Sequence, residues 1–406
     1  MAKFDKLGWI ALAAALVAAG APGPALGADG IHDTEERGDR EIVGALVNPP
    51  PAPCELRRVP KTAEEFSRRA KEIGDYVREF IKGSVVPGIS LALGVGDEFT
   101  HFEGFGFSDL SSGRAVTPQT RFRIGSVSKT LTATALGLLL EEGKLDLDAD
   151  VRQYVPEFPD KGYPITLRQL AIHQSGIRHY RGNEVLNVHS YKNVFEPLTV
   201  FAADPLLAKP GTKHSYSSYG YVLLSAAMER AAGLPFLNLM SGMVLNPLQM
   251  TQTEPELGGR LLPGQATGYV RGTDGKAQVA PKDDLSAIWA GGGYVSTAGD
   301  LLKFARSYLN GRFLRQETLD LLWTPPTPIN GAKSCGGFGW QVARTPKGRR
   351  LLVAGGNSIG GTTVVFVVPE EKVVLVFMTN MTSAPIKGVP AKILGILLGE
   401  EGERGR

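Results

Sequence analysis

The chain reads Phe122-Arg-Ile-Gly-Ser126-Val-Ser-Lys129 and then continues into a largely apolar segment from Leu131 to Leu140, which ends at Gly143. Apolar residues on most sides of a helix are typical of a core helix, and a glycine is a suitable residue at its end. Ser126 lies at the amino end of this predicted helix, and Lys129 follows one turn later on the same face. The sequence therefore predicts a hydroxyl and an amine side by side where a buried helix begins.

An amine one helical turn from a serine can activate the hydroxyl as a nucleophile. Burial favours neutral lysine and lowers its pKa, and the positive end of the helix dipole favours a serine alkoxide. These effects predict Ser126 as the nucleophile and Lys129 as its activating base. A Ser-x-x-Lys tetrapeptide also occurs by chance, but lysine is costly to bury without a role. Ser128 offers a second hydroxyl, on another face of the helix from Ser126.

A second polar patch runs from Lys209 to Tyr221, just before an apolar helix predicted over residues 222–232. The patch contains Tyr216, Tyr219 and Tyr221, and a phenol at a helix start can point its oxygen into a cleft, share a proton with Lys129 and act as a general base. The tyrosines of this patch can equally be half-buried side chains with their hydroxyls at the surface. The residues alone leave both interpretations open.

The sequence Gly356-Asn-Ser-Ile-Gly360 matches the G-x-S-x-G nucleophile elbow, which requires a strand before it and a helix after it. Here a strand-like run from Thr362 to Val368 follows, and all six histidines precede Ser358. The order serine, acid, histidine is therefore impossible, and we interpret the motif as a glycine-rich turn between strands. We interpret His173 as a hydrogen-bonded structural residue rather than a base.

The composition excludes several classes of protein. The 406 residues are 43% hydrophobic and 21% charged, which indicates a globular protein rather than a disordered chain or a coiled-coil rod. The 44 basic and 41 acidic residues leave a net charge of +3, which does not favour nucleic acid or an anionic membrane as a partner. The histidines are scattered, there are two cysteines, and Ser128-Lys-Thr130 lacks the glycine of a phosphate-binding loop. We therefore predict no metal and no cofactor.

Residues 1–28 have the pattern of a signal peptide, with Lys3 and Lys6 before an apolar run and a small-x-small end. This pattern predicts a secreted or periplasmic protein whose mature chain has no membrane segment; an uncleaved anchor is the alternative. In an oxidising compartment Cys54 and Cys335 could pair as a disulfide. Two unpaired thiols are the other interpretation, and the sequence does not decide between them.

The composition of the rest of the chain predicts a linker, one domain and a short tail. Residues 29–60 contain a proline cluster and are predicted as a linker or strap. Residues 61–400 are predicted as one domain with a mainly helical insertion at about residues 140–290, and residues 401–406 as a polar tail.

The predicted domain opens with a helix from Thr62 and strands at Ile89–Val95 and Phe99–Phe107. It ends with four strand-like runs from Trp340 onwards and an apolar helix over Ala391–Leu398. Strands at both ends of the chain, around a helical middle, predict an α+β (α/β sandwich) fold in which helices flank an antiparallel sheet.

These features together resemble the serine β-lactamase and penicillin-binding-protein superfamily. The branch is the class C-like one, with DD-peptidases, family VIII esterases and the mitochondrial β-lactamase-like serine protease. The resemblance covers residues 64–400 and is specific to the superfamily but not to a substrate. The motifs that carry it are Val86-Pro-Gly88, Phe122 to Lys129, Leu170 to Ile177, Tyr216 to Tyr221 and Ala290 to Asp300.

The resemblance implies an acyl-enzyme mechanism in which Ser126 attacks a carbonyl with help from Lys129 and Tyr216. Tyr216 matches the tyrosine of the family's Tyr-x-Asn motif, and Ser218 stands where that motif usually has asparagine. By the same resemblance, the oxyanion and substrate site uses Ser126, Ser218, Gly356 and Asn357, with backbone N–H groups of Ser126 and Asn357 as the oxyanion donors.

The third family motif, Lys-Thr-Gly or His-Thr/Ser-Gly, is replaced here by Ala354-Gly-Gly356. Without that motif, a charge-assisted hydrogen bond of about 1.5–3 kcal/mol is lost, which weakens the binding of substrates that carry a carboxylate. Penicillins and D-Ala-D-Ala peptides are substrates of this kind. We therefore predict a serine hydrolase that cleaves an ester or peptide bond of a small-molecule or peptide substrate. The alternatives are a D-Ala-D-Ala carboxypeptidase or class C-like β-lactamase, and a catalytically weak binding or scaffold protein. The oligomeric state is not predicted.

Overall fold

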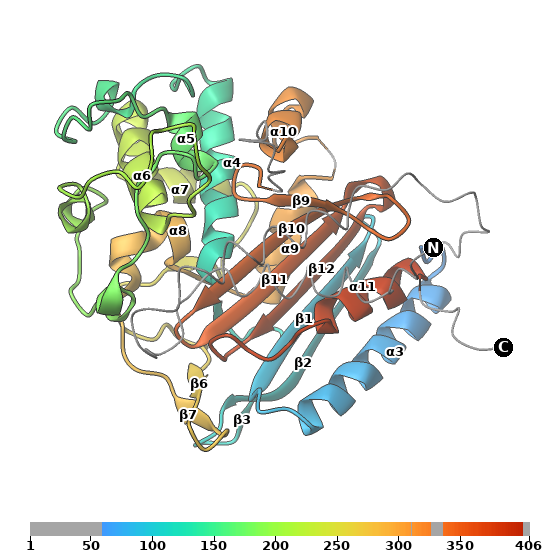
Figure 1. The fold of residues 1–406 in the computed structure, drawn as a ribbon. Helices are drawn as coiled ribbons and strands as arrows, with labels where there is room; N and C mark the ends of the chain where they lie inside the picture. The colour runs from blue at the N-terminus through green and yellow to red at the C-terminus, as the bar shows by residue number, and fades with distance from the viewer. Residues whose placement is uncertain (1–58, 310, 326–335, 401–406) are drawn as a thin grey trace, which may run out of the picture.

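A computed structural model describes residues 59–309, 311–325 and 336–400 of the chain. Its centre is a seven-stranded antiparallel sheet in the order β3-β2-β1-β12-β11-β10-β9 (Figure 1). The strands are β1 (Gly88–Val95), β2 (Phe99–Asp109), β3 (Arg114–Ala115), β9 (Gln341–Arg344), β10 (Arg350–Ser358), β11 (Gly361–Val368) and β12 (Val373–Thr379). Because β1 pairs with β12, the strands from the two ends of the domain meet in the middle of the sheet. The predicted antiparallel α+β fold is confirmed.

Two helices from opposite ends of the chain cover one face of the sheet (Figure 1). They are α3 (Ala63–Lys82), which begins after the N-cap Thr62 as predicted, and α11 (Val389–Leu398). Ile73 of α3 and Leu394 of α11 lie in one core cluster with the sheet residues whose side chains point to this face. Burying these apolar side chains holds the two helices on the sheet.

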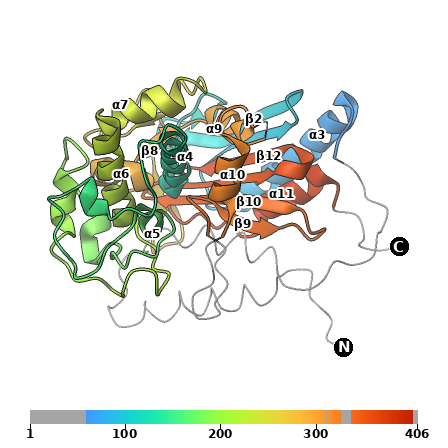
Figure 2. The ribbon, with the colours of Figure 1, turned by 90° about the horizontal axis from the view of Figure 1, so that it is seen from above.

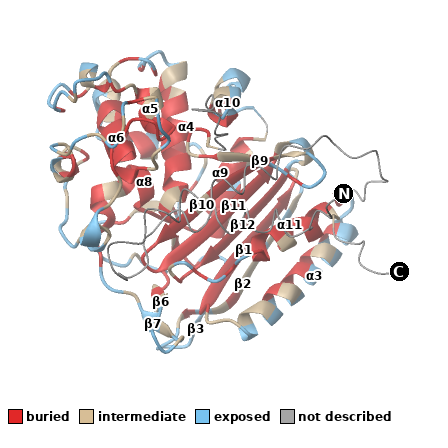
Figure 3. Ribbon diagram, viewed as in Figure 1, coloured by how far each residue is buried: buried red, intermediate tan, exposed pale blue. Residues whose placement is uncertain are grey.

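The other face of the sheet carries α9 (Ala298–Ser307), α10 (Gln316–Trp323) and a group of helices beyond them (Figure 2). This group contains α4 (Ser128–Glu141), α5 (Leu167–Ala171), α6 (Ser218–Ala232), α7 (Phe236–Met240) and α8 (Trp289–Gly292). Figure 3 shows that α4 is buried along almost its whole length, as its apolar sequence predicts. Gly143, just beyond α4, adopts the left-handed conformation that favours glycine.

Short elements complete the described chain. The minor strands are β4 (Phe122–Arg123), β5 (Glu254–Pro255), β6 (Tyr269–Arg271), β7 (Ala277–Val279) and β8 (Tyr294–Ser296). The short 3₁₀ and π turns are η1 (Gly125–Val127), η2 (Val151–Gln153), η3 (Gly182–Leu186), η4 (Glu196–Val200), η5 (Ser241–Leu245), η6 (Leu285–Ile288) and η7 (Pro369–Glu371). None of the helices in the described ranges combines the length and apolar character needed to cross a membrane. The predicted signal peptide, linker and tail, and both cysteines, lie outside the described residues, apart from the end of the linker.

The Gly356–Gly360 motif differs in part from its prediction as a turn. A strand does follow it, but only Ile359 and Gly360 lie between β10 and β11. Residues 356–358 belong to β10, because its register with β11 extends to the pair Ser358 and Gly361. Gly356 is therefore part of the strand, and the turn consists of Ile359 and Gly360, whose φ is +76°.

Gly356 allows β10 to pass close to η1. A Cβ atom on this residue would collide with the carbonyl oxygen of Ile124 and lie 3.0 Å from the amide nitrogen of Val127. Both contacts are with backbone atoms, which cannot turn aside as a flexible side chain can. The glycine at this position is therefore required by packing.

We expect Gly356→Ala to destabilise the protein by about 1–3 kcal/mol, the usual cost of overpacking a closed site. For a domain of this size the melting temperature falls by a few degrees per kcal/mol, which thermal unfolding followed by circular dichroism would measure. Gly242→Ala is the matched control, because no atom lies within 4 Å of its added Cβ and its φ is not positive. Equal melting temperatures for the two variants would show that β10 moves away from η1 without cost.

Candidate active site

Ser126 and Lys129 lie where β4 turns into α4. Ser126 belongs to η1, the single 3₁₀ turn that precedes α4, and Lys129 is the second residue of α4. Gly125 makes this turn possible, with φ of +49° and an added Cβ that would lie 2.7 Å from both the nitrogen and the oxygen of Asn357. The local sequence thus brings the serine to the edge of β10.

The three predicted catalytic side chains meet at one point. The hydroxyls of Ser126 and Tyr216 are 2.6 Å apart, and Lys129 Nζ donates to Ser126 Oγ at 3.1 Å. The second candidate hydroxyl, Ser128 Oγ, is buried and accepts the N–H of Tyr294 at 3.3 Å. The structure therefore places Ser126, not Ser128, beside the amine and the phenol.

Lys129 is a buried amine held by neutral oxygens. Its side chain is 2% exposed, and Nζ also donates to Ser218 Oγ at 3.0 Å and to the carbonyl of Gly291 at 2.5 Å. Burial lowers the pKa of Lys129 below its ordinary value, and the nearby Tyr216 opposes this effect. Among the described residues no carboxylate forms an ion pair with Lys129. These conditions favour the neutral amine that base chemistry requires.

Tyr216 is held in place by the residues around the start of α6. The N-cap Ser217 accepts the N–H of Gly220 at 3.0 Å and donates its own N–H to His173 Nδ1 at 3.2 Å. The ring of His173 lies 4.4 Å from the Tyr216 ring. Burial holds the pKa of His173 well below its usual range, so it is neutral and accepts this hydrogen bond. The prediction of a hydrogen-bonded structural histidine is confirmed.

His179 has a similar role that the sequence did not reveal. Its Nδ1 accepts the N–H of Ser218 at 3.2 Å, and its ring meets the Tyr216 ring edge-on at 5.3 Å. Burial, together with the charges of Lys129 and Arg178, lowers the pKa of His179 to about 3. The two neutral histidines therefore accept the N–H groups of the consecutive residues Ser217 and Ser218, where α6 begins.

The edge of β10 places the backbone of Asn357 beside Gly125, the residue before Ser126. Strand β9 pairs with β10 only as far as Val353. Beyond that residue the same edge of β10 faces η1 instead of another described strand, while its other edge stays paired with β11. The nitrogen and oxygen of Asn357 both face Gly125, as the N–H and C=O of one residue in an antiparallel strand do. Its side chain turns away and bonds to Ser383, at 2.7 Å through Nδ2 and 2.8 Å through Oδ1. Asn357 therefore offers its backbone to the site.

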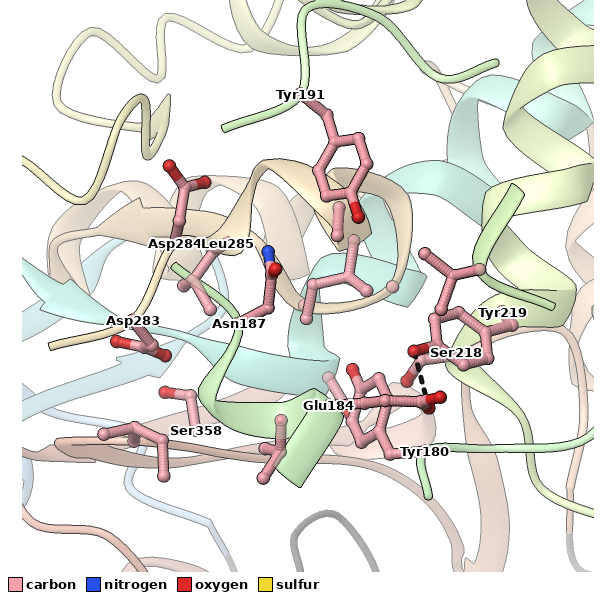
Figure 4. A pocket seen from close by; sticks show the side chains of 18 of the residues that line it. Tyr180, Glu184, Asn187, Tyr191, Ser218, Tyr219, Asp283, Asp284, Leu285 and Ser358 are labelled. Carbon is pink, nitrogen blue, oxygen red and sulfur yellow. Dashed lines mark hydrogen bonds between the residues drawn. The ribbon is translucent and has the colours of Figure 1, made fainter. Parts of the chain in front are cut away.

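A cavity of about 110 Å³ opens next to these groups (Figure 4). Ser126, Ser218 and Asn357 line it, whereas Gly356 is not among the lining residues and packs against η1. Several side chains of its wall were not predicted from the sequence as site residues, namely Tyr180, Glu184, Tyr191, Tyr219, Asp283 and Ile288. Apart from Tyr219, which is the second residue of α6, they lie in short turns or irregular segments without a periodic pattern. The acidic pair Asp283-Asp284 before the glycine run was the one available signal.

The hydrogen bonds of the other tyrosines show which hydroxyls are structural. Tyr221 donates to the carbonyl of Ala171 at 2.9 Å, and Tyr219 donates to Glu184 at 2.9 Å (Figure 4). The Tyr216 hydroxyl contacts Ser126 Oγ, as expected of a candidate base. Tyr219 and Tyr221 fit neither interpretation fully, because both are buried and both hydroxyls are bonded inside the protein rather than exposed at its surface. In the described part of the chain no group of three or more His, Cys, Asp or Glu residues could hold a metal ion.

Comparison with known proteins agrees with this geometry. The human mitochondrial serine beta-lactamase-like protein LACTB is 29% identical over 440 residues, covering 85% of this chain and 78% of the relative. A D-aminopeptidase of Gluconobacter oxydans is 27% identical and covers 77% of this chain and 59% of the relative. The solved D-amino acid amidase of Ochrobactrum anthropi SV3 superimposes with a TM-score of 0.72 at 24% identity, covering 82% of this chain and all of that chain, which shows a shared fold.

The family model described as Beta-lactamase matches residues 73–392, which include every residue of the site described above. Relatives with this fold include serine hydrolases, and the present chain keeps the serine, lysine and tyrosine in mutual contact. The chain is therefore a serine hydrolase that belongs to the beta-lactamase family.

Proposed function

We propose that the enzyme hydrolyses an ester or amide bond through an acyl-enzyme on Ser126. One observation carries the proposal: Ser126 Oγ contacts both the buried amine of Lys129 and the hydroxyl of Tyr216. A serine hydroxyl is a weak nucleophile unless an adjacent base takes its proton. Both neighbours are within the distance that proton transfer requires.

In the proposed first step, Ser126 Oγ forms a bond to the carbonyl carbon of the substrate. The proton of the hydroxyl enters the pair formed by Tyr216 Oη and Lys129 Nζ. The carbonyl oxygen becomes an oxyanion that accepts the backbone N–H groups of Ser126 and Asn357, each worth about 10²–10³ in rate. Tyr216 then returns the proton to the leaving group as the bond to that group breaks.

The second step is the reverse of the first with water as the nucleophile. Water gives a proton to the Tyr216 and Lys129 pair and attacks the acyl carbon, and Ser126 leaves with a proton restored to Oγ. Ser218 accepts from Lys129 Nζ at 3.0 Å and lines the cavity, so we assign it to positioning the amine and the substrate.

The proposed substrate class follows from the residues that replace the family's third motif. Ala354, Gly355 and Gly356 supply no cation at the place where the family's third motif has one, so we propose esters and peptide or amide bonds ahead of penicillins. The D-aminopeptidase relative acts on peptides by its name, which is consistent with amide cleavage. A purely binding role is disfavoured, because an uncompensated buried lysine in contact with a serine serves no packing purpose.

We also propose that residues 1–28 direct export, that residues 61–400 form one catalytic domain, and that the enzyme works in the periplasm or outside the cell. The support is the pattern of basic, apolar and small residues at the amino terminus.

A fluorophosphonate probe tests the mechanism. We expect the wild-type protein to gain one covalent adduct, and peptide mass spectrometry to locate it on Ser126. A parallel set of p-nitrophenyl esters, peptide p-nitroanilides and nitrocefin then ranks the substrate classes. An adduct on Ser128 or Ser358, or no adduct at all, would contradict the proposal, and nitrocefin turnover equal to that of a true β-lactamase would favour the alternative substrate.

A further inference from the structure

One wall of the cavity contains a carboxylate that is only half paired. Arg123 uses Nε and Nη2 for Glu256, with the Nε bond at 2.8 Å. Its Nη1 donates to Asp283 Oδ1 at 2.5 Å and to the carbonyl of Ile359 at 2.8 Å. Four of the five N–H donors of the guanidinium are therefore committed, and a bidentate pair forms with Glu256 but not with Asp283.

Two polar atoms of this wall have no partner among the described residues. They are Asp283 Oδ2 and Ser358 Oγ, both buried, on residues that are 3% and 9% exposed. Both residues line the cavity that Ser126 lines (Figure 4). They are held close together, because one Arg123 nitrogen bonds both Asp283 and Ile359, the residue after Ser358. Buried polar atoms normally have a hydrogen-bond partner, and the cavity that both residues line gives a ligand access to this wall.

The charges of this wall do not balance. A single Arg123 faces two buried carboxylates, Glu256 and Asp283, which leaves one negative charge in excess. Asp284, also on the wall, accepts from a hydroxyl and a backbone N–H, and none of the described cations pairs with it. Among the carboxylates that line the cavity, only Glu184 has both oxygens bonded to an arginine, Arg178, at 2.7 and 2.9 Å. An uncompensated buried carboxylate is costly, and a cation would offset that cost.

We propose that Asp283 and Ser358 bind a protonated amine of the substrate, so that the enzyme prefers acyl groups that carry an ammonium near the scissile carbonyl. The proposal rests on the proposed acyl-enzyme function and adds a substrate class to it. An ammonium has only donors, which matches the two unpaired acceptors. The same wall repels carboxylates, the opposite of what a cationic third motif selects.

The protonation state of Asp283 supports this role. Burial raises its pKa to about 6 even though Arg123 opposes the shift. The carboxylate is therefore mostly ionised at neutral pH, and it is poorly compensated. The amine of a substrate would supply Asp283 Oδ2 with the hydrogen bond that Arg123 does not make.

A matched substrate pair tests the proposal. Alanine p-nitroanilide and isobutyryl p-nitroanilide differ by an ammonium in place of a methyl group. At pH 7 we expect wild-type kcat/KM to be at least about 10-fold higher for one enantiomer of the ammonium substrate, the effect of one charge-assisted hydrogen bond. Asp283→Asn should reduce this ratio by about 10-fold or more, and Ser358→Ala by less. Asp320→Asn, which removes an exposed carboxylate on α10, should leave the ratio unchanged.

The possible results distinguish failure of the ammonium site from failure of the acyl-enzyme mechanism. Equal kcat/KM values for the two substrates in the wild type would overturn the ammonium site, and so would an unchanged ratio in Asp283→Asn; ordered water would then be the partner of both atoms. If fluorophosphonate still labels Ser126 in that case, the acyl-enzyme mechanism stands. If Asp283→Asn does not fold, the wild-type ratio and Ser358→Ala decide, together with inhibition of ester hydrolysis by isopropylammonium but not by 2-propanol.

Discussion

Replacing Ser126 with alanine is expected to lower kcat for a p-nitrophenyl ester by on the order of 10⁶-fold, the loss that follows removal of the nucleophile in another serine hydrolase. Lys129 and Tyr216 both contact Ser126 Oγ, so both lose their common partner with it. Residues that act as one unit give a loss of this size when the nucleophile is removed. The measurement is steady-state hydrolysis corrected for the spontaneous rate.

Ser128→Ala is the matched control for this prediction. Its hydroxyl accepts the N–H of Tyr294 and is away from Ser126 Oγ, so its loss should leave kcat within about tenfold and cost about 1–3 kcal/mol of stability. Circular dichroism of both variants confirms that they fold. Substantial turnover by Ser126→Ala would mean that a different residue is the nucleophile.

Replacing Lys129 with methionine is expected to lower kcat by about 10²–10⁴-fold, the usual contribution of a general base. Methionine has a similar length but cannot take a proton. We expect this large loss of kcat to be accompanied by only a small change in stability, because the fold should tolerate methionine at this position. Removal of the amine leaves Gly291 O and Ser218 Oγ without their donor, which costs about 1–3 kcal/mol, but it also removes the cost of burying the amine.

The pH dependence of stability provides a second test with the Lys129→Met variant. The folded pKa of Lys129 is lowered from its ordinary 10.5, so the unfolded chain binds the proton more tightly. Wild-type stability therefore rises with pH between the lowered pKa and 10.5, and this rise is missing in Lys129→Met. Urea unfolding across this range measures the difference. Parallel pH curves for the two proteins would mean that Lys129 is not an amine with a lowered pKa, and unchanged kcat would remove it from the mechanism.

The central features of the fold and site could be predicted because they depend on local pattern. The spacing of Ser126 and Lys129 is set by helix geometry alone, and burial of Lys129 follows from the apolar residues of α4. The alternation and turns of the terminal strands predicted antiparallel pairing. Tyr216 remained undecided, because a phenol before a helix has the same sequence whether it faces a cleft or the surface.

The rest depends on contacts between distant segments. Asp283 is 160 residues from Arg123, and its free oxygen exists only because Glu256 takes the other side of the guanidinium. The support of Tyr216 by His173 and His179 requires the loop before α6 to fold back on α5. The close passage of β10 past η1 at Gly356 likewise exists only in three dimensions. No periodicity encodes such contacts, since periodicity reports only which face of an element is buried.

The pairing of β1 with β12 also bears on how the chain is made. All eight residues of β1 are buried in the finished sheet, yet their partners in β12 lie 278 to 290 residues later in the chain (Val95 with Val373, Ile89 with Thr379). During translation β1 can pair only with β2. The other edge of β1 has no partner until β12 has been synthesised. Folding rates fall as contacts become less local, so we expect this sheet to close late. Until then the edge of β1 is an exposed template for aggregation, and a chaperone that shields it would act at this stage.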